Sequence, residues 1–175
     1  MHPTPTCDSG TGLLIVAHGT RDPQGLTEFQ GVVDAVAGRL ERSVVEGGFL
    51  ELAEPNIATA VARSVERGAH RHLDVVPLVL FAAGHAKSDI PRAVASAAAG
   101  HSGLTTRMLP HLGCHDRILE LSALRYREAL APRPPVPSDE TLLLMVGRGS
   151  HDPSANGEMA RFARLRFEWL STGWL

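Results

Sequence analysis

Apolar runs alternate with amphipathic stretches along most of this 175-residue chain, from residue 13 to about residue 130. Residues 13–17 are continuously apolar, which is typical of a parallel strand that helices cover on both faces. Asp22 and Pro23 then supply an N-cap and a first helical residue. Apolar residues follow at helical spacing, namely Leu26, Phe29, Val32, Val33, Val36 and Leu40. The pattern therefore predicts a strand and then a helix over residues 13–40.

The alternation continues with further predicted strands and helices. A second strand lies within residues 44–52, and Pro55 opens the helix that follows it. A third strand is predicted over residues 73–82, where Pro77 cannot donate to the ladder and indicates a bulge or a locally unpaired edge. The remaining elements are helices over residues 88–99 and 116–130 and a strand over residues 105–109. We therefore predict an α/β fold: an open parallel sheet of the flavodoxin-type order 2-1-3-4, with helices on both faces.

The segment LLIVAHGTRDP, residues 13–23, has a near copy 130 positions later in LLMVGRGSHDP, residues 143–153. The second copy has Arg148 where the first copy has His18. A proline-rich stretch over residues 131–140 precedes the second copy and is predicted to be a linker. Self-similarity at a long period indicates a duplicated strand, turn and helix start. The predicted domains are a lobe over residues 13–130, the linker, and the opening βα unit of a second, truncated lobe over residues 141–175.

Composition is that of an ordinary soluble domain and excludes several classes of protein. The net charge of −2 gives no basic footprint for nucleic acid, and no apolar run approaches the roughly 20 residues that span a bilayer. Residues 1–12 have neither a basic start nor an apolar stretch, so we predict a disordered tail, no signal peptide and a cytoplasmic location. The two cysteines, Cys7 and Cys114, form neither a disulfide framework nor a CxxC metal motif.

Three side chains with metal-binding chemistry follow the first three predicted strands. In an open parallel sheet, ligands bind outside the carboxyl ends of the strands, where the strand order reverses. His18, Glu51 and His85 would then face one crevice, although they are 33 and 34 residues apart in the sequence. Two imidazoles and a carboxylate suit a divalent first-row metal such as Co²⁺, Fe²⁺, Ni²⁺ or Zn²⁺. Glu54 is the rival carboxylate, and a strand-end glutamate is commonly just solvated.

Three sequence blocks occur in the order and at the intervals of one enzyme family. These blocks are AHGTRDP, FLELAEP and LFAAGHAKSDIP, which occupy residues 17–23, 49–55 and 80–91. With them the sequence resembles the class II chelatases, and most closely the sirohydrochlorin chelatases that insert cobalt or iron. The resemblance covers residues 13 to about 130 and resumes at VGRGSHDPSANGEMARFARL.

The resemblance implies a two-lobed or dimeric α/β fold and ATP-independent insertion of Co²⁺ or Fe²⁺ into sirohydrochlorin, in cobalamin or siroheme biosynthesis. It implies no organic cofactor, places the family's two metal-handling histidines on His18 and His85, and places their acidic partner on Glu51. Longer members are gene duplications whose second lobe loses the histidines, which accounts for Arg148 at the position that corresponds to His18. The candidates for contacts with the substrate's carboxylates are Arg21, Lys87, Arg92 and Arg148, although each is more commonly an ordinary surface charge.

Several alternatives stay open at the level of sequence. Residues 141–175 either begin a truncated second lobe or complete the first lobe as a fifth strand. In a homodimer, the second chain would rebuild the wall of the site that the truncated lobe lacks. A carrier of metal or tetrapyrrole could use the same site without catalysis. A phosphoryl-transfer enzyme could phosphorylate His18 and hold the phosphate with Arg21. Sequence does not separate cobalt from iron or nickel, because the same ligands accept all three.

Overall fold

The computed structural model describes residues 10–40, 44–68, 70–81, 84–134, 137 and 140–171, without the side chains of residues 85, 86 and 169–171. Most of the predicted tail, residues 1–9, lies outside the described residues, and the first strand already begins at Thr11. The chain divides into two compact units. One comprises Met1–Val79 and Gly84–His111, and the other comprises Leu80–Ala83 and Leu112–Leu175.

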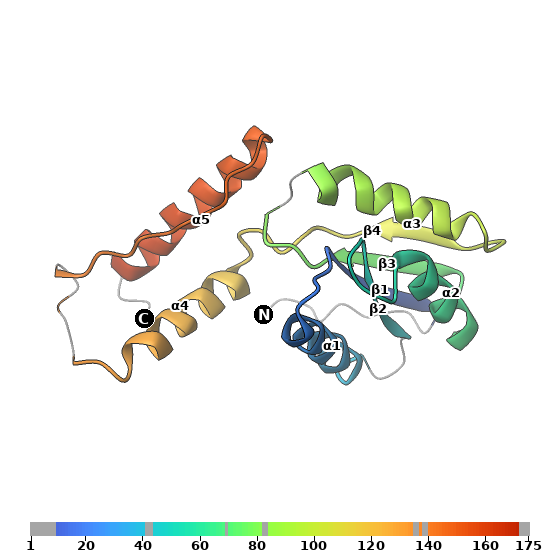
Figure 1. The fold of residues 1–175 in the computed structure, drawn as a ribbon, viewed down its shortest axis with the longest axis horizontal. Helices are drawn as coiled ribbons and strands as arrows, with labels where there is room; N and C mark the ends of the chain where they lie inside the picture. The colour runs from blue at the N-terminus through green and yellow to red at the C-terminus, as the bar shows by residue number, and fades with distance from the viewer. Residues whose placement is uncertain are drawn as a thin grey trace. The chain divides into compact units, whose positions relative to one another are not determined.

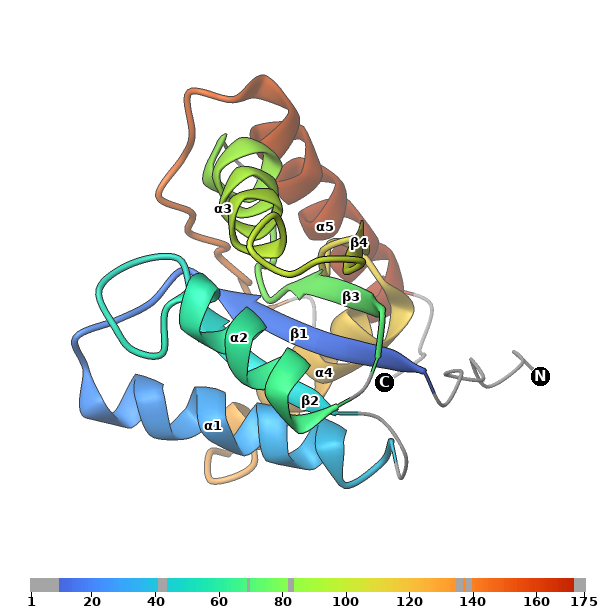
Figure 2. The same ribbon diagram turned by 90° about the vertical axis from the view of Figure 1, so that its right-hand side faces the viewer.

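The first unit is built on four parallel strands in the order β2-β1-β3-β4 (Figure 1). The strands are β1 (Thr11–Ala17), β2 (Val45–Phe49), β3 (His72–Pro77) and β4 (Thr105–Met108). The helices are α1 (Pro23–Ala37), α2 (Ile57–Arg67) and α3 (Ile90–Ala98), with a π-helical turn, η1 (His85–Asp89), before α3. Figure 2 shows α1 on one face of the sheet and α2 and α3 on the other. The predicted fold class and strand order are therefore confirmed.

Two apolar layers cover the sheet, and glycines in β2 allow the helices to approach it. Leu14, Val16 and the side chains of α2 and α3 form one layer, and Ile15 packs with α1 in the other. A Cβ on Gly47 would lie 2.7 Å from atoms of Phe29, and a Cβ on Gly48 would lie 2.9 Å from that of Ala60. The sequence VEGGF is thus a fully buried strand because helices contact both of its faces.

The third strand ends five residues earlier than the sequence predicts. Pro77 is its last residue and pairs in register with Val16 of β1, whereas the pairing with β4 stops at Val75. Pro77 is thus locally unpaired on the β4 side, one of the two outcomes that the sequence predicts. The chain leaves the sheet after the amide of Leu78 donates to the Val16 carbonyl at 2.7 Å. His85 consequently lies in η1 and does not close the strand. A proline, which lacks the N–H that continues a ladder, is a physical reason for the early end.

The helix starts are mostly as predicted, because they depend on local caps. The carboxylate of Asp22 accepts a hydrogen bond from the amide of Gln24 at 3.1 Å, and α1 begins at Pro23. The predicted start of α2 at Pro55 is wrong, because the helix begins at Ile57 and Asn56 is its N-cap. The Asn56 side chain caps the helix by accepting from the amide of Thr59 at 3.0 Å.

The second unit contains α4 (Asp116–Leu130) and α5 (Pro153–Ser171), which contact each other. Among the described residues of this unit, the buried ones are Leu119, Ala123, Ala155, Phe162 and Arg166. The predicted strand at the start of the second copy is wrong, because residues 141–150 form no strand. Leu142, Leu144 and Val146 are 87%, 75% and 84% exposed. A strand needs hydrogen-bonding neighbours, and the described part of this unit supplies none. The boundaries of the predicted lobes and linker stay a prediction.

Among the described residues, no helix combines the length and apolar character that a membrane crossing requires.

Candidate functional site

The backbone ladder continues past the ends of β1 and β2 and brings His18 and Glu51 together. The amide of Leu50 donates to the Ala17 carbonyl at 2.9 Å, and the amide of Glu51 donates to the His18 carbonyl at 3.0 Å. The side chains follow, with His18 Nε2 and Glu51 Oε1 3.0 Å apart. The two side chains are 46% and 51% exposed, so a ligand can reach them from solvent. Two of the three predicted metal ligands therefore meet at the carboxyl edge of the sheet.

Gly19 permits this close approach of the two loops. Its φ is +111°, and a Cβ at this position would lie 1.7 Å from the carbonyl oxygen of Glu51. Leu52 also has a positive φ, 66°, which a residue other than glycine rarely adopts. Strained backbone of this kind is concentrated at functional sites, where the surrounding structure holds it in place.

The rival carboxylate, Glu54, has a local structural role. Its side chain accepts hydrogen bonds from the amide of Asn56 at 2.7 Å and from Asn56 Nδ2 at 3.2 Å. The peptide bond between Glu54 and Pro55 is cis. The amide of Phe49 donates to the Pro55 carbonyl at 2.9 Å and closes the loop that carries Glu51. The geometry thus favours Glu51 over Glu54 as the acidic partner of His18.

A cavity of about 380 Å³ lies beside His18 on the face of the sheet that α1 covers. Its walls are mainly apolar, which is typical of sites for small organic ligands. The lining residues are Ala17, His18, Gly19, Thr20, Gly25, Glu28, Phe29, Val32, Phe49 and Leu78. Sequence analysis assigned Phe29 and Val32 only to the apolar face of a helix. No sequence signal distinguishes a cavity wall from a core position of the same spacing.

The third predicted ligand, His85, has its backbone in η1, and its side chain lies outside the described residues. The contact of His85 with His18 and Glu51 therefore stays a prediction. Among the side chains that the structure does describe, no three His, Cys, Asp or Glu residues are grouped closely enough to hold a metal ion. The His18–Glu51 pair is an incomplete coordination sphere by itself, because first-row metals take at least four ligands.

The predicted substrate-binding residues lie in different surroundings. Arg21 and Lys87 are exposed in the first unit. Arg92 forms an ion pair with Asp89 three residues before it. Arg148 is exposed in the second unit.

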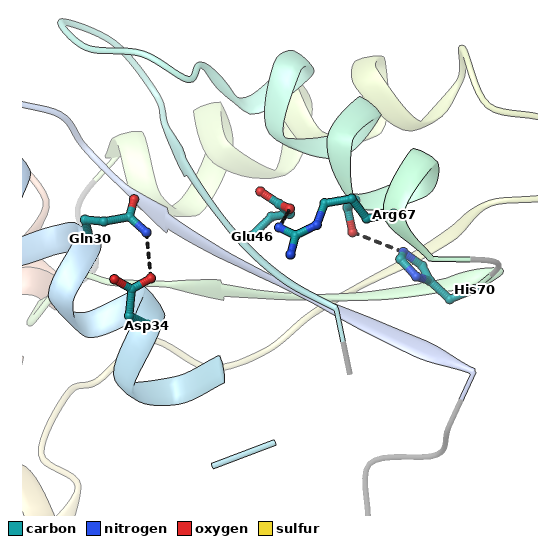
Figure 3. A network of polar contacts seen from close by, with 6 residues as sticks. Gln30, Asp34, Glu46, Arg67 and His70 are labelled. Atoms are coloured by element: carbon teal, nitrogen blue, oxygen red, sulfur yellow. Dashed lines mark hydrogen bonds and ion pairs between the residues drawn. The ribbon is translucent and has the colours of Figure 1, made fainter. Parts of the chain in front are cut away.

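A separate polar network lies at the opposite edge of the sheet, towards the amino ends of the strands (Figure 3). Ser64 Oγ and His70 Nε2 are 3.1 Å apart, and Arg67 forms an ion pair with the buried Glu46. Burial lowers the pKa of His70 below its ordinary value, so its neutral form is favoured. None of these four residues lines the cavity beside His18.

Comparison with known proteins connects this geometry to a family. The CbiX family model matches residues 12–129. The chain is 31% identical over 157 residues to a sirohydrochlorin cobaltochelatase of Priestia megaterium, covering 89% of this chain and 50% of that protein. It is also 31% identical over 121 residues to a sirohydrochlorin cobaltochelatase of Sulfurisphaera tokodaii, covering 68% of this chain and 93% of that one.

Among solved structures, the chain is similar to the sirohydrochlorin chelatase SirB of Bacillus subtilis subspecies spizizenii in complex with cobalt. The TM-score is 0.74 at 29% identity, and the match covers 89% of this chain and 61% of that one. The chain thus spans about half to three fifths of the length of the longer relatives that it matches.

Proposed function

Because the chain belongs to the CbiX family, we propose that it inserts a divalent metal ion, Co²⁺ or Fe²⁺, into sirohydrochlorin without ATP. The metal ion is a substrate of this reaction. The observation that carries the proposal is the contact of 3.0 Å between His18 Nε2 and Glu51 Oε1 beside an apolar cavity. This contact lies within the residues that the family model matches.

Metal insertion removes water from the ion, breaks two pyrrole N–H bonds and forms bonds from the pyrrole nitrogens to the metal. Two protons are released for each ion inserted. Imidazole nitrogen is a borderline ligand, which captures a first-row ion and leaves coordination positions open for the incoming macrocycle. In this proposal His18 and His85 bind the incoming ion.

Glu51 has two proposed roles, both of which follow from its contact with His18. Before the metal arrives, the carboxylate accepts a hydrogen bond from Nε2–H and orients the ring. To bind the ion through Nε2, the ring takes the tautomer protonated at Nδ1, losing the Nε2 proton to solvent and gaining one at Nδ1. The ionised carboxylate then lies where it can join the coordination sphere or accept a pyrrole proton. Its negative charge also attracts the cation.

Cationic side chains that follow His18 and His85 in the sequence are proposed to bind the substrate's carboxylates. Arg21 follows His18 by three residues on the same exposed loop, and Lys87 follows His85 by two. Arg92 would have to exchange its ion pair with Asp89 for a substrate carboxylate. Guanidinium groups suit this role because they bind carboxylates through two parallel hydrogen bonds.

An anaerobic insertion assay tests the proposal. Sirohydrochlorin is mixed with Co²⁺ or Fe²⁺, and the absorbance change of metal insertion is followed. We expect His18→Ala and His85→Ala to lower the rate by about 100-fold or more, which is the usual scale for a lost proton-transfer or ligating group. His72→Ala is the control, because this exposed histidine lies at the amino end of β3.

Two outcomes would contradict the proposal. Absence of insertion by the wild-type chain with either metal would exclude the activity, and stoichiometric binding of Co²⁺ without turnover would identify a carrier instead. Unchanged rates in both histidine variants would exclude the proposed site.

A further inference from the structure

Metal insertion releases two protons, and Glu51 can accept at most one of them. A carboxylate that has taken up one proton is a neutral acid and does not take up a second near neutral pH. The side chain of Glu51 contacts His18 at 3.0 Å but is not among the residues that line the cavity. A pyrrole N–H inside the cavity therefore needs another acceptor.

The described residues that line the cavity include two titratable side chains, His18 and Glu28. The remaining lining residues are apolar, glycine or threonine, and none of these side chains is a base near neutral pH. The Nε2 atom of His18 binds the ion in the proposed reaction, so it is not available for a pyrrole proton. Glu28 is thus the one remaining base among these lining residues.

Glu28 belongs to the face of α1 that forms one wall of the cavity. The lining residues from this helix are Gly25, Glu28, Phe29 and Val32. They follow the i, i+3, i+4, i+7 spacing of one helix face. Phe29 is buried, whereas Glu28 is exposed. The carboxylate therefore both lines the cavity and reaches solvent, to which an accepted proton can be released.

The start of α1 is fixed to the loop that carries His18. Thr20 Oγ1 accepts a hydrogen bond from the amide of Asp22 at 3.0 Å, and the Asp22 carboxylate caps the helix at 3.1 Å. A Cβ at Gly25 would lie 2.9 Å from Thr20 Cγ2, so the missing side chain lets the loop lie directly against the helix. The wall that carries Glu28 and the loop that carries His18 therefore keep a fixed relative position.

The Glu28 carboxylate keeps one oxygen available for a proton. Its Oε1 accepts a hydrogen bond from Gln24 Nε2 at 2.9 Å, between neighbouring turns of α1. Within the described part of the chain, no cation pairs with Glu28 and its Oε2 has no hydrogen-bond partner. An ion pair with a cation would favour the charged carboxylate and make it a weaker base. The contacts of Glu28 thus suit a proton acceptor.

We propose that Glu28 is a further catalytic residue, whose carboxylate accepts a pyrrole proton as the metal ion enters the macrocycle. The inference rests on the proposed function. One pyrrole N–H bond breaks, its electron pair forms the bond from nitrogen to the metal, and the proton passes to Oε2 of Glu28. The other pyrrole proton passes to Glu51. The neutral carboxylic acid of Glu28 then releases its proton to solvent, which restores the carboxylate for the next turnover.

The kinetics of Glu28→Gln test this proposal, with sirohydrochlorin and Co²⁺ under anaerobic conditions. Glutamine keeps the size of the side chain and an oxygen that can accept from Gln24, but it is not a base. We expect kcat to fall about 100-fold and the KM for sirohydrochlorin to stay unchanged, which is the pattern for a lost general base.

Asp34→Asn is the matched control on the same helix. Asp34 accepts from Gln30 Nε2 at 2.8 Å, which repeats the pairing of Glu28 with a glutamine four residues earlier (Figure 3). Asp34 does not line the cavity. Its variant should therefore insert metal at the rate of the wild type.

Chemical rescue separates proton transfer from a structural role. In Glu28→Ala, added acetate should raise the insertion rate about 10-fold, because a small carboxylate can enter the emptied place and take the proton. Acetate should not change the rate of the wild type or of His18→Ala. Titration with Co²⁺ alone should give Glu28→Gln the Kd of the wild type, because Glu28 is not a proposed metal ligand.

Four results would overturn the role of Glu28 in an active chain. These are a wild-type kcat in Glu28→Gln, an equal loss in Asp34→Asn, a raised KM at unchanged kcat, and a Kd for Co²⁺ that rises in proportion to the loss of rate. A slow Glu28→Ala protein that acetate does not rescue would show a structural role instead. A wild-type chain that inserts no metal would contradict the proposed function as well, whereas an active wild type with an unaffected Glu28→Gln would overturn this inference alone.

Discussion

At the scale of single residues, the site depends on how closely two loops approach each other. His18 and Glu51 face each other because hydrogen bonds from Leu50 and Glu51 extend the ladder beyond the strands. Gly19 makes room for the carbonyl of Glu51. A small backbone shift at this point would separate the imidazole from the carboxylate.

Gly19→Ala should therefore impair both stability and activity. The added Cβ would lie 1.7 Å from the Glu51 carbonyl oxygen, and the φ of +111° is strained for alanine. We expect a loss of about 1–3 kcal/mol in the free energy of unfolding, measured by urea denaturation, and a lower insertion rate. Gly31→Ala is the control, because nothing lies within 4 Å of a Cβ at that position of α1. A Gly19→Ala protein with wild-type stability and rate would contradict the geometry.

His70 should make the stability of the protein depend on pH. Burial lowers its pKa in the folded state below the ordinary value of 6.5, so the unfolded chain takes up the proton first as the pH falls. The stabilisation from the neutral ring is present above pH 6.5 and is lost as the pH falls through that value towards the folded pKa. Urea denaturation at pH 7.5 and pH 5.5 should show a larger fall in the wild type than in His70→Gln. An equal fall in both proteins would contradict this account.

At the scale of elements, locally capped helix ends and the common edge of parallel strands could be predicted, whereas the residue at which strand pairing stops could not. The start of α1 after the Asp22 cap and both ends of α4, Asp116 and Leu130, were predicted from the local sequence alone. The pairing of His18 with Glu51 was predictable because parallel strands end at one edge of a sheet. The early end of β3 at Pro77 was not predictable, because apolar residues continue to Ala82 and only the ladder shows where pairing stops.

The repeated segment shows the same limit more clearly. Residues 13–17 and 143–147 are nearly alike, yet only the first set forms a strand. Leu14 is fully buried between β2 and β3, whereas its counterpart Leu144 is 75% exposed. Apolar sequence permits a strand, but neighbouring strands are required to form it. The helix of the second copy needs no such neighbours and forms as predicted.

The buried Arg166 on α5 should destabilise the helix pair of the second unit. Its side chain is 1% exposed, and in the described part of the chain none of its three guanidinium nitrogens has a hydrogen-bond partner. Burial accordingly lowers its pKa. The first copy has Val36 at this position, packed against the core. Arg166→Val should stabilise the protein by about 1–4 kcal/mol, which is the gain measured when buried charges are replaced by packed apolar residues.

Thermal and urea denaturation of Arg166→Val test this expectation. Arg164→Val is the control, because that residue is exposed on the same helix and pairs with Glu168. Destabilisation by Arg166→Val would show that the guanidinium is stabilised by a partner in the protein.

At the scale of the whole molecule, two compact units carry two versions of one loop. The first version places His18 beside Glu51, and in the second Arg148 stands at the equivalent position while Asn156 hydrogen-bonds to Ser150. The proposed metal site, His18, Glu51 and His85, belongs entirely to the first of the two units. The chain as a whole covers 50% of the Priestia megaterium cobaltochelatase.

The central claim is that His18 and Glu51 act as one unit in metal transfer, and a double-mutant cycle on the insertion rate tests it most directly. Rates of Co²⁺ insertion under anaerobic conditions are measured for the wild type, His18→Ala, Glu51→Gln and the double variant. We predict a loss of about 100-fold for His18→Ala, about 10-fold to 100-fold for Glu51→Gln, and a double variant no slower than His18→Ala. Losses that multiply in the double variant, or a Glu51→Gln protein as fast as the wild type, would contradict the claim.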